Sequence, residues 1–140
     1  ENDNLYFLDI KDQVFRKIFK DIKDLKVSPD FKKITYFTDS EILIFFLEDI
    51  TNEQPQRKAK DQLFLTRFSE KISDVLWWTN HYLIFNTGSM IKIVEIDDRD
   101  KINIYDLREF KNPKIFWNQI EKRLYILSNG NLYISEKLIP

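Results

Sequence analysis

The chain has 140 residues, of which 43% are hydrophobic and 32% are charged, and its formal net charge at pH 7 is -1. This size suits one domain with a buried core, and the near-neutral charge lacks the basic surface that non-specific nucleic-acid binding requires. The longest apolar run, residues 42–47, is far shorter than the roughly 20 residues that a membrane-spanning helix needs. We therefore expect a single domain over residues 1–140, with no nucleic-acid partner and no membrane contact by this segment.

A short apolar pattern near the start of the chain returns at a regular spacing. It occupies residues 4–7 and recurs at residues 41–44, 90–93 and 131–134, which gives a repeat of about 42 residues. A second apolar run precedes each of the later copies, and a short polar turn separates the two runs. Each pair is typical of a β-hairpin, and Asn129-Gly130 suits a tight turn whose central residues have positive φ.

Flanking apolar runs extend each repeat to a four-stranded antiparallel unit. These units divide the chain into a partial unit at 4–20, complete units at 24–68 and 74–107, and a partial final unit at 114–135. The predicted strands are, in chain order, 4–7 and 14–19; 25–27, 34–37, 41–44 and 63–68; 75–77, 83–86, 90–93 and 102–107; 115–117, 124–127 and 131–134.

The runs favour strands over helices because they are short, rich in β-branched and aromatic residues, and separated by turn residues. One alternative stays open at residues 11–26, where Val14, Ile18, Ile22 and Leu25 have helical spacing. The repeat predicts a strand within that region instead.

Residues 42–46 are apolar at every position, so both faces of this strand are expected to be covered. Each blade of a β-propeller is packed on both sides by its neighbours around a central axis. We therefore predict an all-β fold, a β-propeller segment of about three four-stranded antiparallel blades. The chain begins within one blade and ends one strand short of another, which favours an incomplete, open part of a larger propeller.

Residues 27–37, VSPDFKKITYF, resemble the SPDGKK turn and following strand of TolB-like propeller repeats. Pro29 presets φ for a type I turn, while Ser28 and Asp30 can bond to neighbouring backbone N–H groups. Phe31 stands where the family has glycine.

Residues 66–77 and 91–97 are similar to propeller repeats of bacterial proteins that carry PEGA domains, and residues 117–133 resemble the last repeat of such chains. The resemblance covers most of the chain, although no Gly-His or Trp-Asp pair typical of Trp-Asp (WD40) repeats is present.

The resemblance implies a non-catalytic scaffold for protein interaction or surface recognition in a bacterial, envelope-associated protein. It further implies an extracytoplasmic location, with an anchor in a missing N-terminal segment; a cytoplasmic location stays open. Edge strands are expected to pair with the rest of the propeller or with another copy. The alternative is the gating propeller of a prolyl-oligopeptidase-like hydrolase whose catalytic domain lies outside these residues.

Four side chains are candidate partner contacts. Arg57, Lys58 and Lys60 lie in a long polar insertion and could meet an acidic partner, while Trp78 could stack on a protein or a cell-surface glycan. Trp77 and Trp117 occupy matching repeat positions, which favours a structural role between blades.

Catalytic and cofactor motifs are absent from the sequence. Gly88 and Gly130 are the only glycines, which excludes phosphate-binding loops, dinucleotide-binding motifs and nucleophile elbows. With His81 as the sole histidine and no cysteine, a zinc site is not expected, and the acidic residues 97–100 favour a solvated turn over a calcium loop. We expect no enzyme activity, cofactor or metal.

Overall fold

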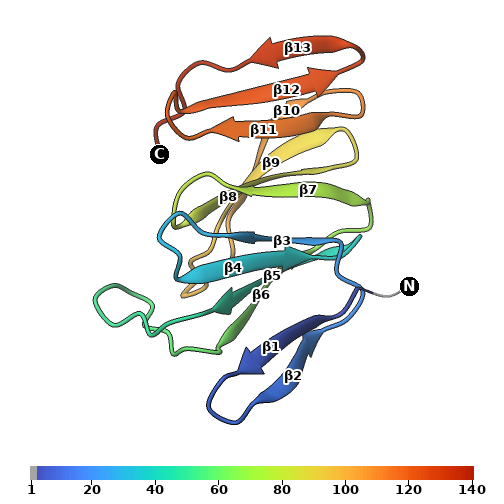
Figure 1. Ribbon diagram of the computed structural model, residues 1–140. Helices are drawn as coiled ribbons and strands as arrows, with labels where there is room; N and C mark the ends of the chain where they lie inside the picture. The colour runs from blue at the N-terminus through green and yellow to red at the C-terminus, as the bar shows by residue number, and fades with distance from the viewer. Residues whose placement is uncertain (1–2) are drawn as a thin grey trace.

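The computed structural model describes residues 3–140, which contain thirteen β-strands and no helix. The strands pair into four antiparallel sheets, each a meander of consecutive strands (Figure 1). The first sheet contains β1 (Leu5–Asp9) and β2 (Val14–Phe19). The second contains β3 (Asp24–Val27), β4 (Lys33–Phe37), β5 (Glu41–Phe46) and β6 (Gln62–Arg67). The third contains β7 (Ile72–Trp77), β8 (Tyr82–Thr87), β9 (Met90–Glu95) and β10 (Ile104–Glu109). The fourth contains β11 (Lys114–Asn118), β12 (Arg123–Ser128) and β13 (Asn131–Ile134).

The all-β class predicted from the sequence is confirmed. The helical alternative for residues 11–26 is wrong, because β2 pairs with β1 and the chain then bends at Asp21, which has a φ of 56°, before β3 begins. The strand predicted at 102–107 is shifted and spans Ile104–Glu109, since its pairing with β9 begins at Ile104; Ile102 packs against the core from the preceding loop. No helix in the described part of the chain could cross a membrane.

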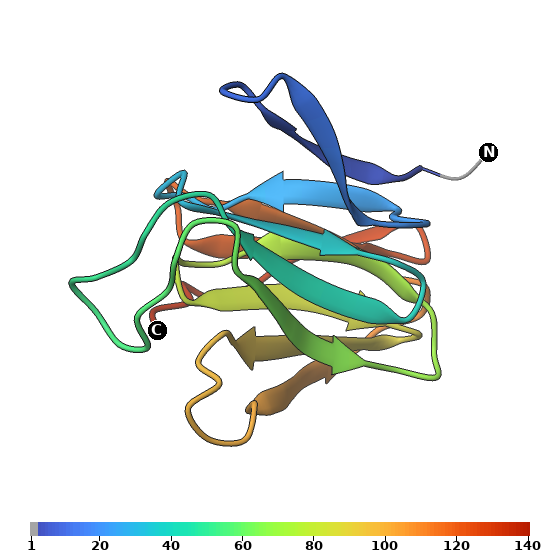
Figure 2. The ribbon, with the colours of Figure 1, turned by 90° about the horizontal axis from the view of Figure 1, so that it is seen from below.

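The sheets stack face to face, from β1–β2 at one end to β11–β13 at the other (Figures 1 and 2). An apolar cluster fills each of the three gaps between neighbouring sheets. Every residue of β4 is buried, because alternate side chains of this strand point into different clusters. Ile34 and Tyr36 face the first sheet, whereas Phe37 faces the third. The expectation that the central strands are covered on both faces is confirmed.

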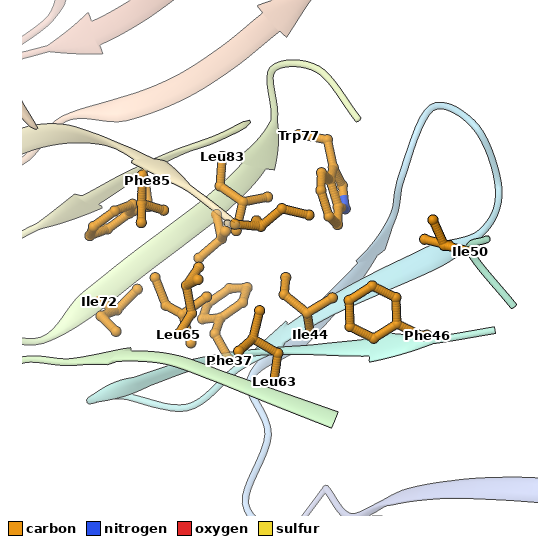
Figure 3. Close-up of a cluster of buried hydrophobic side chains, with 14 residues drawn as sticks. Phe37, Ile44, Phe46, Ile50, Leu63, Leu65, Ile72, Trp77, Leu83 and Phe85 are labelled. Carbon is orange, nitrogen blue, oxygen red and sulfur yellow. The ribbon is translucent and has the colours of Figure 1, made fainter. Parts of the chain in front are cut away.

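The gap between the second and third sheets holds the largest cluster (Figure 3). Phe37 and Ile44 from one sheet point toward Leu83 and Phe85 from the other. Trp77 closes one side of this cluster, and its indole N–H donates to the Lys26 carbonyl at 2.9 Å. Since Trp77 lies between two sheets, and Trp117 packs in the same way between the third and fourth, their predicted structural role is confirmed.

Tight turns in this glycine-poor chain depend on other residues in the left-handed region. Asn129 and Gly130 have φ values of 51° and 76° and join β12 to β13 by the predicted two-residue turn. Phe31 also has a positive φ, 60°, and its side chain is 75% exposed. The β3–β4 turn therefore keeps the expected geometry at a steric cost to Phe31.

Replacing Phe31 by glycine should stabilise the domain by about 1 kcal/mol, because the steric cost of positive φ disappears while little packing is lost. Urea unfolding of the Phe31→Gly variant measures this gain. The Phe31→Ala variant is the control: it removes the ring but keeps a Cβ, and it should show no gain. Equal stabilisation by both variants would mean that the ring, and not the backbone, is the source of the cost.

Candidate functional site

A charged cleft of about 260 Å³ opens between the second and third sheets. It lies where three connections meet: the long β5–β6 connection, the β7–β8 turn and the β9–β10 loop. An isolated bridge between Ile50 and Arg57 shapes the first connection, and Ile96 N–H donates to the His81 carbonyl at 2.9 Å to join the other two. The residues that line the cleft are Lys33, Phe46, Ile50, Glu53, Gln54, Pro55, Arg57, His81, Glu95, Ile96, Asp97 and Arg99.

Arginine–aspartate pairs form one wall of the cleft. Arg57 pairs with Asp98 across the two sheets, and its guanidinium carbon lies 5.2 Å from the centre of the Phe46 ring. Arg99 donates from Nε to both carboxylate oxygens of Asp97 at 3.0 Å. These hydrogen bonds lower the pKa of Asp97 to about 2, so this carboxylate stays ionised at any physiological pH.

His81 faces the opposite connection, where its Nε2 lies 3.4 Å from a carboxylate oxygen of Glu53. Both side chains are partly exposed, which leaves the pair accessible to a ligand. Among the residues that line the cleft, none carries a hydroxyl or thiol. The cleft is suited to hydrogen bonding and charge pairing with a polar chain.

A buried ion pair lies at the base of the cleft. The Lys33 side chain is 1% exposed, and its Nζ lies 2.8 Å from Asp30 Oδ2. Burial raises the pKa of Asp30, but hydrogen bonds from Lys33, Ser28 and the Lys32 N–H outweigh burial and lower it. The Asp30 N–H in turn donates to Asn80 Oδ1 at 2.9 Å, which links the β3–β4 turn to the β7–β8 turn.

The three basic candidates separate in space. Arg57 lines the cleft but is held by Asp98. Lys60 lies on the other side of the same connection, with its Nζ 2.9 Å from Asp9 Oδ2 and 5.3 Å from the centre of the Phe7 ring. Lys58 is exposed, and its backbone N–H donates to Asp61. Two of the three candidate cations therefore bind neighbouring sheets of the same chain.

Trp78 is covered, contrary to the expectation of an exposed stacking surface. Only 9% of this residue is accessible, and its ring packs 5.6 Å from that of Tyr82 within the cluster between the third and fourth sheets. Leu138 packs against this cluster, and Leu138 and Ile139 line a second cleft of about 280 Å³ beside Trp78.

The sequence indicated neither the His81–Glu53 pair nor the position of Arg99 in the lining of the cleft. His81 lies in the β7–β8 turn and Glu53 in the β5–β6 connection, so their contact crosses from one sheet to the next and no local sequence pattern indicates it. The acidic residues 97–100 form a turn between β9 and β10, in which Asp97 and Asp98 each pair with an arginine. Residues 3–140 contain no group of three or more acidic or histidine side chains placed to hold a metal ion.

No family model matches this chain, and no curated protein matches it. Among solved structures, the chain is similar to Hsv2 from Kluyvelomyces marxianus, with 11% sequence identity and a TM-score of 0.31. The match covers 81% of this chain and 50% of that chain, so the chain spans about half the length of that protein. A TM-score this low does not establish a common fold, and the description of the fold rests on strand pairing and packing alone.

Arg57→Met should destabilise the domain by about 1–2 kcal/mol, because Asp98 loses its partner and the connection loses its bond to the third sheet. Lys58→Met is the matched control from the adjacent position, and it should leave the free energy of unfolding within about 0.5 kcal/mol of the wild-type value. Equal losses in the two variants, measured by urea unfolding, would contradict the role given to the Arg57–Asp98 pair.

Asp30→Asn should cost about 3 kcal/mol at neutral pH, because the buried Lys33 ammonium is left without a counter-charge. The pKa of Asp30 is lowered in the folded state, so its contribution is complete above the ordinary value of 3.8 and is lost as the pH falls below it. The stability difference between wild type and variant should therefore narrow on acidification, as measured by urea unfolding at pH 7 and in steps below pH 4. Asp100→Asn, at an exposed carboxylate, should show neither effect. A difference that stays constant with pH would contradict this assignment.

Proposed function

We propose that this chain is a β-propeller segment that acts as a non-catalytic scaffold for protein recognition and binds a polypeptide partner at the cleft between the second and third sheets. The cleft carries the proposal: loops from two neighbouring sheets meet there around side chains of both charge signs. Loops held at the end of a rigid sheet scaffold are where binding residues concentrate.

The propeller arrangement is supported by the way the sheets approach each other. Strand β7, the first strand of its sheet, contacts β3, the first strand of the second sheet, and β11, the first strand of the fourth. Sheets that meet at their first strands converge there, as the blades of a propeller converge on an axis. The open edge of β13 then corresponds to a missing fourth strand, which another part of a longer propeller or another copy would supply.

A polypeptide fits the cleft better than a glycan. Sugar recognition commonly uses an exposed aromatic face, whereas Trp78 is only 9% exposed and its ring packs against that of Tyr82. The cleft is instead lined by Arg99, His81 and Glu95, a mixture that suits a segment with both acidic and basic groups. An extracytoplasmic, envelope-associated location stays a prediction from the resemblance to TolB-like repeats.

Selection of a random peptide library displayed on phage against the purified chain tests this proposal. Selected peptides should bind the wild type and lose at least about tenfold in affinity, or roughly 1.4 kcal/mol, to an Arg99→Glu variant. Lys58→Glu is the matched charge reversal outside the cleft and should leave the affinity unchanged. Circular dichroism confirms that both variants fold. Failure to enrich any peptide, or peptides indifferent to Arg99→Glu, would contradict the assignment of the cleft.

A further inference from the structure

Inside this molecule, every contact between neighbouring sheets joins one face of a sheet to the other kind of face of the next sheet. We call the face of a sheet that looks toward the next sheet in the chain its forward face, and the other its backward face. The forward face of the second sheet, with Phe37, Ile42 and Ile44, packs on Leu83 and Phe85 from the backward face of the third. The forward face of the third sheet likewise packs on the backward face of the fourth; the residues in that gap are Ile84, Ile91, Ile115, Leu124 and Ile126.

The fourth sheet carries a forward face of the same construction that nothing in the described residues covers. Leu132 and Ile134 occupy the repeat positions of Ile91 and Ile93, and they are 61% and 53% exposed. Their register places them on one face with other large side chains, because Leu132 pairs with Leu127 and Ile134 with Tyr125, which also pairs with Phe116. Leu124 and Ile126, which alternate with these positions, point the other way into the core.

The first sheet presents the opposite surface at the other end of the stack. Leu5 and Phe7 pack against the second sheet, so the alternate residues Tyr6 and Leu8 point away from it. Phe15 of β2 pairs directly with Leu8 and is 68% exposed. This backward face carries Tyr6, Leu8 and Phe15, with Lys17 paired opposite Tyr6.

We propose that the chain associates head to tail with a second copy of itself, so that the forward face of the fourth sheet in one copy packs on the backward face of the first sheet in the next. The two uncovered faces have opposite directions, which is the combination that each covered gap inside the molecule uses. A second copy therefore continues the direction of the sheet stacking, with the three-stranded fourth sheet against the two-stranded first sheet. Clustered apolar surface of this extent on a single face is typical of an interaction site.

This contact is heterologous, because each copy uses a different surface on each side. A pair of copies still exposes one forward and one backward face, so the assembly grows until the rotation between copies closes a ring. Its mass must increase with protein concentration. The contact surfaces lie at the ends of the stack, away from the cleft between the second and third sheets. Self-association and peptide recognition can therefore succeed or fail independently.

Sedimentation velocity of two complementary variants tests the proposal. The forward variant carries Leu132→Lys and Ile134→Lys, and the backward variant carries Leu8→Lys and Phe15→Lys. Wild type should show masses that rise with concentration, whereas each variant alone should stay monomeric. An equimolar mixture should give a 1:1 complex that grows no further, because one intact face of each direction remains. Ile120→Lys, at a residue 94% exposed outside both faces, is the control and should assemble as wild type does.

Several results would overturn the proposal. A backward variant that dimerises alone would mean that two forward faces pair with each other. A wild type that stays monomeric up to millimolar concentration, or variants that assemble as wild type does, would remove the contact altogether. Hydrogen exchange of the wild type gives a reading that needs no folded variant. Concentration should protect amides of β1, β2 and β13 together and leave β7 and β8 unchanged; protection of only one end would contradict the head-to-tail contact.

Discussion

The structure depends on apolar packing between adjacent sheets, because no sheet of this chain could be stable alone. A four-stranded meander such as β3–β6 has apolar side chains on both faces and buries them only when another sheet lies on each side. Tyr36 and Phe37 are neighbours in sequence but belong to different clusters, one on each side of the same sheet. Each apolar cluster therefore stabilises both of the sheets that enclose it. Close packing in these clusters keeps the sheets in their order along the stack.

Polar contacts from the loops at the ends of the strands hold neighbouring sheets in fixed positions relative to one another. The long β5–β6 connection reaches the first sheet through Lys60 and Asp9 and the third sheet through Arg57 and Asp98. An exposed ion pair such as Lys60–Asp9 contributes little stability by itself, whereas the Arg57–Asp98 pair is partly buried and contributes more. Their effect is geometric, since they hold one connection in contact with three sheets and keep the cleft walls in place. The candidate binding site thus lies beside the connection that bonds to the first and third sheets.

Much of the fold could be predicted from the sequence because the repeat is visible in short apolar patterns. The copies at 41–44, 90–93 and 131–134 lie in β5, β9 and β13, and Asn129-Gly130 forms the expected turn. Strand ends were less predictable where the loop itself packs on the core, as at Ile102. Phe31 was hard to judge, because no local pattern tells whether a bulky residue will accept positive φ in place of glycine.

The candidate site was only partly predictable for a related reason. Arg57, Lys58 and Lys60 are equivalent in sequence, and only contacts between distant segments distinguish the cation in the cleft from the one bonded to the first sheet and the one in solvent. The burial of Trp78 was not predictable, because it depends on packing between the third and fourth sheets. Sequence periodicity reports which residues share a strand, whereas a binding surface depends on which strands and loops become neighbours.

The serial order of the sheets also governs how the molecule comes apart. Inner sheets have two neighbours and end sheets only one, so the free energy of local opening should fall from β4 and β8 toward both termini, as in nearest-neighbour arrays. Fraying would then begin in the β1–β2 hairpin and in β13, and exposure to proteases would follow the same gradient. Any partner that caps an end would raise the cooperativity of the whole chain without touching its centre.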